Sequence, residues 1–426
     1  MLPRTEGIDH RMLRLLCWLV IGTIILLMLR SAYLTPAIDG RVQHQPPGTD
    51  IQLRIALGLY RLGSAEPEAL KQAQEAVGKP AADHPLALSQ ALVAEVILGA
   101  DAAREYLPTD PALTEVTSWI EQRWDDPVQV PAPAAPPELA QHAGRFARLL
   151  GPPDVRQRLL DGSAAFMAAI SLLAVGGLLA LAIGVGLMVV ALRRLASGRI
   201  CAVPITSPHP SAYLVGFTLY LILYLAYAGT VPQLLPKGMR IYAIWGFLPF
   251  LVVPLWYLRR QGLGTVAASL GWQRGRGWLR EMGSGMLGYL AGLPIVVLGV
   301  LATAWLAQFM HSSHPVAEMI NADTPLSVYI GLFALAAGFA PVVEELFFRG
   351  FLVAHLLPRW GMPVTLLATG VVFAAVHPQG LAGIPALAAI GIVFAAIRCW
   401  RGSLIASAIA HALHNGALLL LMLLLT

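Results

Sequence analysis

The hydrophobic positions of this chain gather into long uncharged runs, and short polar connections separate them. Because a helix needs about 20 apolar residues to cross roughly 30 Å of hydrocarbon, runs of this length predict membrane-spanning helices. We expect about nine spans, at residues 15–29, 163–192, 211–235, 241–258, 284–307, 326–343, 363–377, 384–397 and 403–425. The pattern therefore predicts an all-α fold, a polytopic bundle of transmembrane helices.

Residues 31–158, between the first two spans, have the pattern of a soluble helical domain. Pro67 and Pro85 each open a helix, and glycines follow the expected helix ends near residues 63, 78 and 99. A Pro-rich linker at residues 128–137 is expected to be extended. One more helix, near residues 138–150, then leads back to the membrane.

The composition supports a membrane protein. Hydrophobic residues make up 57% of the chain and charged residues 12%, whereas soluble domains carry roughly 25% charged residues. The 29 Lys and Arg exceed the 24 Asp and Glu, but the sequence has no basic patch with interleaved aromatics, so we expect no nucleic-acid partner. The cysteines at 17, 201 and 399 lie in or beside apolar segments, which is not the spacing of a disulfide framework or a CxxC metal site.

The arginines predict the orientation of the spans, because cytoplasmic loops of membrane proteins are enriched in Arg and Lys. Arg11 and Arg14 precede the first apolar run, and no small-residue cleavage site follows it, so we expect a retained signal anchor with its N-terminus in the cytoplasm. With alternating spans, four sets of arginines fall on that same side, at residues 193–199, 259–280, 349–359 and 398–401. We expect the chain to lie in a bacterial inner membrane.

This orientation divides the chain into four parts. Residues 1–30 form the first span, and residues 31–158 form a small extracytoplasmic α-helical domain. Residues 159–240 form a pair of transmembrane helices, and residues 241–426 form a core that carries the unusual polar groups.

Two adjacent carboxylates and a guanidinium end the otherwise uncharged run that precedes residue 350. An ionisable side chain inside a span costs about 2.5–3.5 kcal/mol on insertion scales, so it tends to find a partner and to mark a functional site. Glu345 and Arg349 are spaced i,i+4 with the acid first, which favours an ion pair. Glu344 points about 100° away around the helix, and a carboxylate without a cation in low dielectric suits a general base. In the alternative interpretation, both acids pair with Arg349 and other basic groups at the membrane edge.

Polar side chains also occur in two later apolar helices. His377 closes one of them, and His411 and Asn415 share a face of the last one because they are spaced i,i+4. His414 lies three residues after His411 and is a rival for that face. A single histidine in a helix is more often a satisfied core group than a catalyst. Three helices that each carry such groups offset the insertion cost most simply if the groups meet.

The depths of these groups conflict if the helices are straight. At 1.5 Å per residue, Glu344 lies roughly 7 Å in from Arg349, whereas His377 lies about 20 Å in from Pro363. Prolines at 341, 363 and 378, together with helix tilt, are expected to close this gap.

Three polar motifs thus follow one another on successive hydrophobic helices. They are Glu344-Glu345-x-x-x-Arg349, Phe373-x-x-x-His377 and His411-x-x-x-Asn415. In this order they resemble the CAAX prenyl protease and bacteriocin-processing family of intramembrane peptidases, also called the abortive-infection family. The resemblance covers roughly residues 240–426 and implies that residues 241–426 are an intramembrane peptidase core. Residues 31–158 are not part of the common core of that family.

The resemblance implies an endopeptidase that hydrolyses a peptide bond of a peptide or protein tail at the membrane. It implies that Glu344, with His377, activates a water molecule for attack on the peptide carbonyl. It also implies that His411 and Asn415 stabilise the oxyanion. General-base and oxyanion chemistry are within the reach of these side chains.

The resemblance leaves Glu345 and Arg349 a structural role, in which they orient the end of the helix. Participation of a metal stays open. The H-E-x-x-H signature of zinc peptidases is absent from the sequence, but two histidines and a glutamate would satisfy the three-ligand pattern of catalytic zinc. Because Asn415 is a poor zinc ligand and a good oxyanion donor, we favour a mechanism without a cofactor and keep a divalent metal such as zinc as the alternative.

Two alternative functions are also considered. A non-catalytic membrane transporter or partner-binding scaffold would use the same polar cluster as a proton or ion site; inverted repeats would support a transporter, and the sequence shows none. Alternatively, residues 31–158 bind a protein partner and the core acts as their effector. The expected partners are therefore a peptide or protein substrate, the lipid bilayer and a protein that binds the outer domain.

Overall fold

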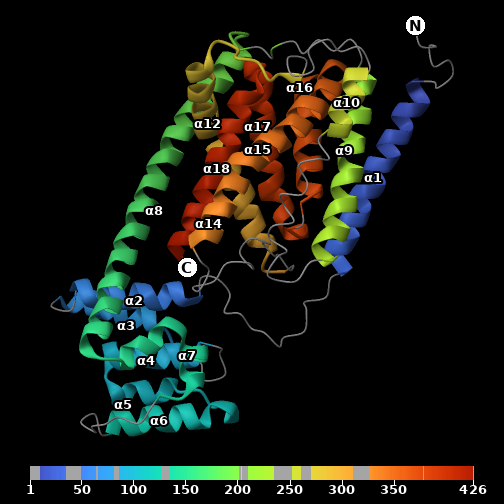
Figure 1. Cartoon of the computed structure of the whole chain (residues 1–426). Helices are drawn as coiled ribbons and strands as arrows, with labels where there is room; N and C mark the ends of the chain where they lie inside the picture. The colour runs from blue at the N-terminus through green and yellow to red at the C-terminus, as the bar shows by residue number, and fades with distance from the viewer. Residues whose placement is uncertain are drawn as a thin grey trace. The chain divides into compact units, whose positions relative to one another are not determined.

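The computed structural model describes residues 10–34, 49–63, 66–80, 86–125, 135–200, 203, 210–234, 252–260, 270–309, 326–377 and 379–425. Every regular element in these ranges is a helix (Figure 1), so the all-α prediction is confirmed. The chain splits into two compact units: Met1–Ile38 with Leu179–Leu423, and Asp39–Leu178 with Leu424–Thr426. Each unit is described by itself.

The unit Asp39–Leu178 is a stack of short helices around one apolar core. Leu57, Leu92 and Ile120 are fully buried in it. Two of its helices end at glycines with positive φ, Gly78 and Gly99, which agrees with the helix ends expected from the sequence. Its helices are α2 (Thr49–Gly63), α3 (Pro67–Val77), α4 (Ala87–Leu98), α5 (Ala100–Ala103), η1 (Arg104–Tyr106), η2 (Pro111–Leu113), α6 (Thr114–Asp125), α7 (Pro137–Ala143), η3 (Gly144–Leu150) and the first part of α8 (Pro153–Ala196).

Three details of this unit differ from the sequence expectation or lie beyond it. The helix expected near 138–150 is an α-helix only to Ala143 and continues as the 3₁₀ helix η3 after Gly144, which has a φ of 52°. The helices between residues 100 and 125 were not anticipated, because their apolar positions are sparse. The Pro-rich linker at 128–137 falls mostly outside the described residues.

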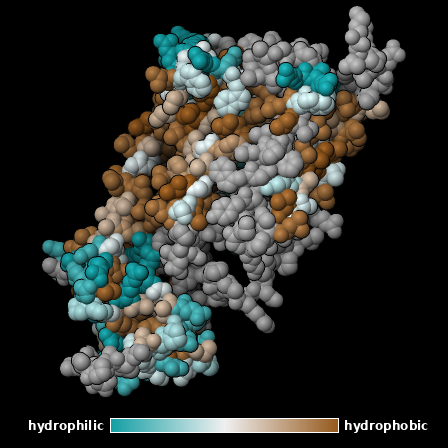
Figure 2. Space-filling view, in the orientation of Figure 1, coloured by the Kyte–Doolittle hydropathy of each residue, from teal (hydrophilic) through white to brown (hydrophobic). Residues whose placement is uncertain are grey.

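Several helices have the length and composition of membrane spans. Among the described residues there are six, namely Arg11–Met28, Pro153–Ala196, Trp278–Leu306, Leu326–Ala375, Leu381–Arg401 and Leu404–Leu424. Their surfaces carry many exposed large apolar side chains, which give the hydrophobic areas in Figure 2. Such surfaces are stable next to lipid, so the chain is a multi-pass membrane protein. The expected count of nine is not confirmed, and most of the span expected at 241–258 lies outside the described residues.

The membrane unit consists of helices contributed by both ends of the chain. Its apolar core is formed where α1 and α9 pack against the segment that follows the two glutamates. The helices are α1 (His10–Leu34), the second part of α8, α9 (Pro210–Leu234), α10 (Val252–Arg260), α12 (Trp278–Leu306), α14 (Leu326–Phe333), η5 (Ala334–Phe339), α15 (Ala340–Glu345), η6 (Leu346–Leu352), α16 (Val353–Ala375), η7 (Leu381–Gly383), α17 (Ile384–Arg401) and α18 (Leu404–Leu425).

The segment with the two glutamates does not end near Arg349, as the predicted span 326–343 assumed. Helical structure continues from α14 through η5, α15 and η6 into α16, and Arg349 is fully buried. The expected boundary was wrong because it treated Arg349 as a marker of the membrane edge. Here the charge is paired inside the protein, so it does not need to reach water.

The chain reverses at Gly361 instead, within the residues assigned to α16. Gly361 has φ 67° and ψ 177°, a conformation that strongly favours glycine because other residues have a clashing Cβ. Residues at similar sequence separations before and after Gly361 are in contact. The ring centroids of Phe348 and Phe373, for example, are 5.0 Å apart. The stretch Leu326–Ala375 is therefore a helical hairpin whose two arms meet along η6 and the second half of α16.

Small residues allow the hairpin to approach α17 closely. A Cβ on Gly370 of α16 would lie 2.7 Å from the carbonyl oxygen of Ala388, and a Cβ on Gly391 of α17 would lie 2.8 Å from the Cα of Gly370. Glycines at such crossings bring backbones together and allow extensive van der Waals contact. Through this contact α17 packs along the second half of α16, the arm of the hairpin that ends just before His377.

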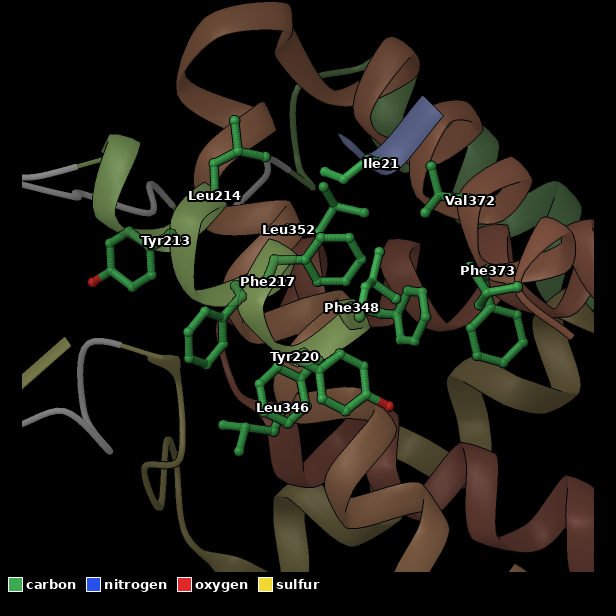
Figure 3. Packing of buried hydrophobic residues seen from close by; sticks show 14 of the residues in the cluster. Ile21, Tyr213, Leu214, Phe217, Tyr220, Leu346, Phe348, Leu352, Val372 and Phe373 are labelled. Carbon is green, nitrogen blue, oxygen red and sulfur yellow. The ribbon is translucent and has the colours of Figure 1, made fainter. Parts of the chain in front are cut away.

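Aromatic rings fill the opposite side of the hairpin (Figure 3). Tyr220 of α9 stacks on Phe347 of η6 with the centroids 3.6 Å apart, and Phe217 meets Phe348 edge to face at 5.4 Å. Such pairs add about 0.5–1.5 kcal/mol each beyond the area they bury. The segment immediately after the glutamates is therefore held firmly from both sides.

We predict that Gly370→Ala destabilises the membrane unit. The added methyl group would meet the backbone of Ala388, which cannot move aside cheaply, so we expect a loss of about 1–3 kcal/mol. Thermal unfolding of the purified full chain in detergent measures the effect. Gly186→Ala is the control, because a Cβ there has no atom within 4 Å; equal unfolding temperatures for the two variants would contradict the close approach.

Candidate active site

Both glutamates are contributed by α15, a short α-helix with π-helical turns on either side. Pro341 lies in its first turn, and the segments η5 and η6 precede and follow it. A π-helical turn accommodates an extra residue and re-aims the side chains beyond it, which is why such turns are frequent at functional sites. The two adjacent glutamates therefore face different surroundings.

Glu345 lies in a completely buried ion pair. Its Oε1 atom accepts a hydrogen bond from the NH1 group of Arg349 at 2.8 Å, and both side chains have 0% exposure. The guanidinium also donates to the carbonyl oxygen of Gly391 at 3.0 Å. The rings of Phe373 and Phe394 lie 4.6 and 5.3 Å from its central carbon, so the cation has both hydrogen-bonding and cation–π partners. The predicted i,i+4 pair is thus present.

His411 of α18 extends this buried group toward Glu344. Its Nδ1 atom is 3.1 Å from Oε1 of Glu345, and since a carboxylate only accepts hydrogen bonds, Nδ1 carries the hydrogen. Its Nε2 atom is 3.8 Å from Oε2 of Glu344. The ring stacks on Phe394 with the centroids 4.7 Å apart, which keeps the imidazole in this orientation.

His377 reaches Glu344 from the end of the second hairpin arm. Its Nδ1 atom is 2.5 Å from the carbonyl oxygen of Phe373, so Nδ1 donates its hydrogen there and Nε2 is an acceptor when the ring is neutral. That Nε2 atom is 3.7 Å from Oε2 of Glu344. The structure therefore brings two imidazole Nε2 atoms, one from the turn that follows α16 and one from α18, to a single carboxylate oxygen on α15.

Exposure divides this cluster into an accessible part and a closed part. The side chains of Glu344 and His377 are 23% and 22% exposed, whereas that of His411 is 4% exposed. Part of the surface of the first two side chains is therefore not covered by protein. Oε2 of Glu344 is itself buried and has no hydrogen-bond partner among the described residues, so it is an unsatisfied acceptor inside the cluster.

The hairpin explains how Glu344 and His377 meet despite the apparent difference in depth. Glu344 lies seventeen residues before Gly361 and His377 sixteen residues after it. At 1.5 Å per residue, both groups lie about 25 Å from the turn. The earlier mismatch arose because Arg349 and Pro363 were taken as the ends of the two helices, whereas the turn is at Gly361.

Asn415 and His414 have partners outside this cluster. Asn415 lies one turn beyond His411 on α18, and its Nδ2 atom donates to the carbonyl oxygen of Ala336 in η5 at 2.7 Å. His414 turns toward α12, where its Nδ1 atom and the hydroxyl of Tyr289 share a hydrogen bond of 2.9 Å. Of the two histidines that competed for one face in the sequence, His411 is the one that faces the glutamates.

The described residues do not fit a metal site. Among them there is no group of three or more His, Cys, Asp or Glu side chains placed to hold a metal ion. We therefore assign no step of the chemistry below to a metal. Proton transfer and hydrogen bonding by the residues of this cluster are the functions that its geometry offers.

The sequence did not point to some residues that shape this site. Gly391 supplies the carbonyl that binds Arg349, Phe394 supports His411, and Tyr289 holds His414. A single apolar or aromatic residue in a transmembrane helix does not indicate a functional role, because most such positions face lipid or the protein core. The spacing of Phe373 four residues before His377 was the only local hint of this kind.

Comparison with known proteins identifies a class for part of the chain. Residues 324–417 match the family model described as Type II CAAX prenyl endopeptidase Rce1-like. The matched segment contains both glutamates and the residues that meet them, and it confirms the family resemblance for this part of the chain. At the level of the family, this supports an intramembrane endopeptidase. No curated protein and no solved structure matches the chain.

We predict that Arg349→Gln is strongly destabilising and that Glu345→Gln partly restores stability in the double variant. Removing one partner leaves the other charge buried and uncompensated, which costs about 3–5 kcal/mol. Thermal unfolding of the four proteins of this cycle measures the coupling.

The matched control is the exposed i,i+4 pair Asp154–Arg158, whose side chains are 64% and 72% exposed. Because exposed pairs contribute about 0–1 kcal/mol, Arg158→Gln should change the unfolding temperature little. If Arg349→Gln were equally mild, the buried pair would not support the fold as described.

Proposed function

We propose that the chain is an intramembrane endopeptidase that uses Glu344 as its general base. The observation that carries this proposal is the approach of Nε2 of His377 and Nε2 of His411 to Oε2 of Glu344, at 3.7 and 3.8 Å. Three helices bring these polar groups together inside an apolar bundle, where each of them is costly unless it is used. The partial exposure of Glu344 and His377 leaves a side on which water and a peptide bond can be bound.

In the proposed reaction, a water molecule donates hydrogen bonds to Glu344 and to Nε2 of His377. Glu344 takes one proton from the water as its oxygen attacks the peptide carbonyl carbon. The C=O bond becomes C–O⁻, and a tetrahedral intermediate forms. When the C–N bond breaks, Glu344 returns the proton to the leaving nitrogen, so the products are a carboxylic acid and an amine, which exchange a proton to become a carboxylate and an ammonium group. Positioned proton transfer of this kind contributes about 10²–10⁴-fold to a rate.

His411 and Asn415 are proposed to stabilise the oxyanion. Nδ1 of His411 is held by Glu345, which leaves Nε2 as the ring nitrogen directed to the site where the oxyanion would form. Asn415 uses one amide N–H to bind Ala336, and we propose that its second N–H, one turn from His411, binds the same oxyanion. Donors that are oriented in advance in a dry site are typically worth 10²–10³-fold in rate.

Glu345 and Arg349 are proposed to act as positioning residues. Their buried pair holds the orientation of His411 and the carbonyl of Gly391 at the same time. Together with the arginine-rich connections, these features fit a bacterial inner-membrane enzyme with a cytoplasmic N-terminus. Its substrate would be a peptide or protein tail that enters at the membrane.

We predict that Glu344→Gln abolishes hydrolysis without loss of folded protein. The amide keeps the size of the side chain but cannot take a proton from water, so we expect a decrease of about 10²–10⁴-fold. The full chain in nanodiscs would be incubated in ¹⁸O-labelled water with a panel of membrane-tethered peptides. Mass spectrometry would then look for ¹⁸O in the new C-terminal carboxylate, and undiminished labelling by the variant would refute the role of Glu344.

We predict that the two neighbouring histidines of α18 differ in their effect on activity. His411→Asn should lower the rate about 10²–10³-fold, because an oxyanion donor is lost. His414→Asn should leave most of the rate intact, since His414 binds Tyr289 rather than Glu344. The same labelling assay, on proteins matched for unfolding temperature, compares them; similar losses would contradict the assignment.

A further inference from the structure

A second polar site lies in the unit Asp39–Leu178, outside the peptidase cluster. A cavity of about 430 Å³ there is lined by Arg54, Arg145, Arg148 and Arg158, together with Leu159 and Ser163. The arginines come from α2 and, about 90 residues later, from the consecutive elements η3 and α8. Among the described residues that line the cavity, none is acidic. Folding has therefore gathered four cations around one space.

The cavity is built on a firmly packed base. The guanidinium carbon of Arg54 lies 3.5 Å from the centroid of the Phe166 ring, and that ring is 3% exposed. Close packing of α2 on α8 adds to this, because a Cβ on Gly58 would meet the carbonyl oxygen of Ser163 at 2.7 Å. The position of Arg54 is thus set by buried neighbours and not by solvent.

The acidic residues of α8 near the cavity already have partners. Asp154 binds Arg158 at 2.7 Å, and Asp161 binds Arg61 at 2.7 Å. These carboxylates neutralise one lining arginine and one arginine outside the cavity. The described side chains that line the cavity include four arginines and no acidic residue, a composition that favours an anionic ligand. A planar guanidinium matches the oxygens of a phosphate with two parallel hydrogen bonds, so phosphate is the anion that this lining fits best.

The position along α8 indicates which phosphate is close. The uncharged run Gly162–Leu192 contains thirty-one residues and rises about 46 Å at 1.5 Å per residue. Since the hydrocarbon core is about 30 Å thick, the ends of the run extend roughly 8 Å beyond it on each side. Leu159 and Ser163 line the cavity at one such end. This is the depth at which lipid headgroups lie.

We propose that this cavity binds a phosphate group, and that the phosphate is that of an anionic phospholipid headgroup. Its volume is in the range of sites for small ligands and accommodates a phosphate with its glycerol. Binding there attaches the outer helical unit to the membrane surface through charge as well as through the α8 span. The proposal does not depend on the peptidase activity.

The test is a titration of the purified full chain in a neutral detergent with short-chain phosphatidylglycerol, followed by calorimetry. Parallel titrations use short-chain phosphatidylcholine and inorganic phosphate. Arg148→Gln removes a lining charge, and Arg104→Gln is the matched control, because Arg104 pairs with Asp125 elsewhere in the same unit. Arg148→Lys keeps the charge and guards against an effect of misfolding.

We expect phosphatidylglycerol to bind at least about tenfold more tightly than phosphatidylcholine. Arg148→Gln should weaken that binding about tenfold or more, since a hydrogen bond to a charged group is typically worth about 1.5–3 kcal/mol. Arg104→Gln should have no effect, and Arg148→Lys should lie between wild type and Arg148→Gln. Absence of binding, equal binding of the two lipids, or equal sensitivity to Arg104→Gln would overturn the proposal. Inorganic phosphate that binds as tightly as phosphatidylglycerol, with the same dependence on Arg148, would overturn the lipid as its source.

Discussion

The buried ion pair between Glu345 and Arg349 is the interaction on which the membrane unit depends. Two charges removed from water cost several kcal/mol each unless their remaining hydrogen-bonding groups are satisfied. Here one guanidinium needs Glu345, the carbonyl of Gly391 and the rings of Phe373 and Phe394. Those partners are on α15, α17 and α16, and His411 of α18 joins through the same carboxylate. The partners of the Arg349 guanidinium and of Glu345 therefore come from four helices, which meet around this ion pair.

The two adjacent glutamates show how environment separates roles for identical side chains. Glu345 is enclosed with its cation, so its charge is committed to structure. Glu344, one position earlier, is partly exposed and has two imidazoles facing it, and among the described residues no arginine forms an ion pair with it. Neighbouring residues on a helix point about 100° apart. Two adjacent carboxylates can therefore lie in different surroundings, one in the core and the other at the candidate catalytic site.

The hairpin turn and the close helix contacts determine the depth of the candidate site. Gly361 lies far enough from Glu344 and His377 that both reach the same level in the bundle. Gly370 and Gly391 let the backbones of α16 and α17 approach, which brings the carbonyl of Gly391 within reach of Arg349. A site assembled in this way lies deep within the protein and needs an opening on one side. Glu344 and His377 are the members of the cluster that keep uncovered surface.

The sequence by itself determined the fold class, the location of the polar motifs and the pairing of Glu345 with Arg349. Apolar run length reports membrane spans, and i,i+4 spacing reports contacts on one helix, so both are local properties. The turn at Gly361, the choice of His411 over His414, the bond from Asn415 to Ala336 and the arginine-lined cavity depend on contacts between segments far apart in the chain. Only the tertiary structure decides these, because the direction of each side chain depends on how the helices pack, and no local spacing encodes that packing.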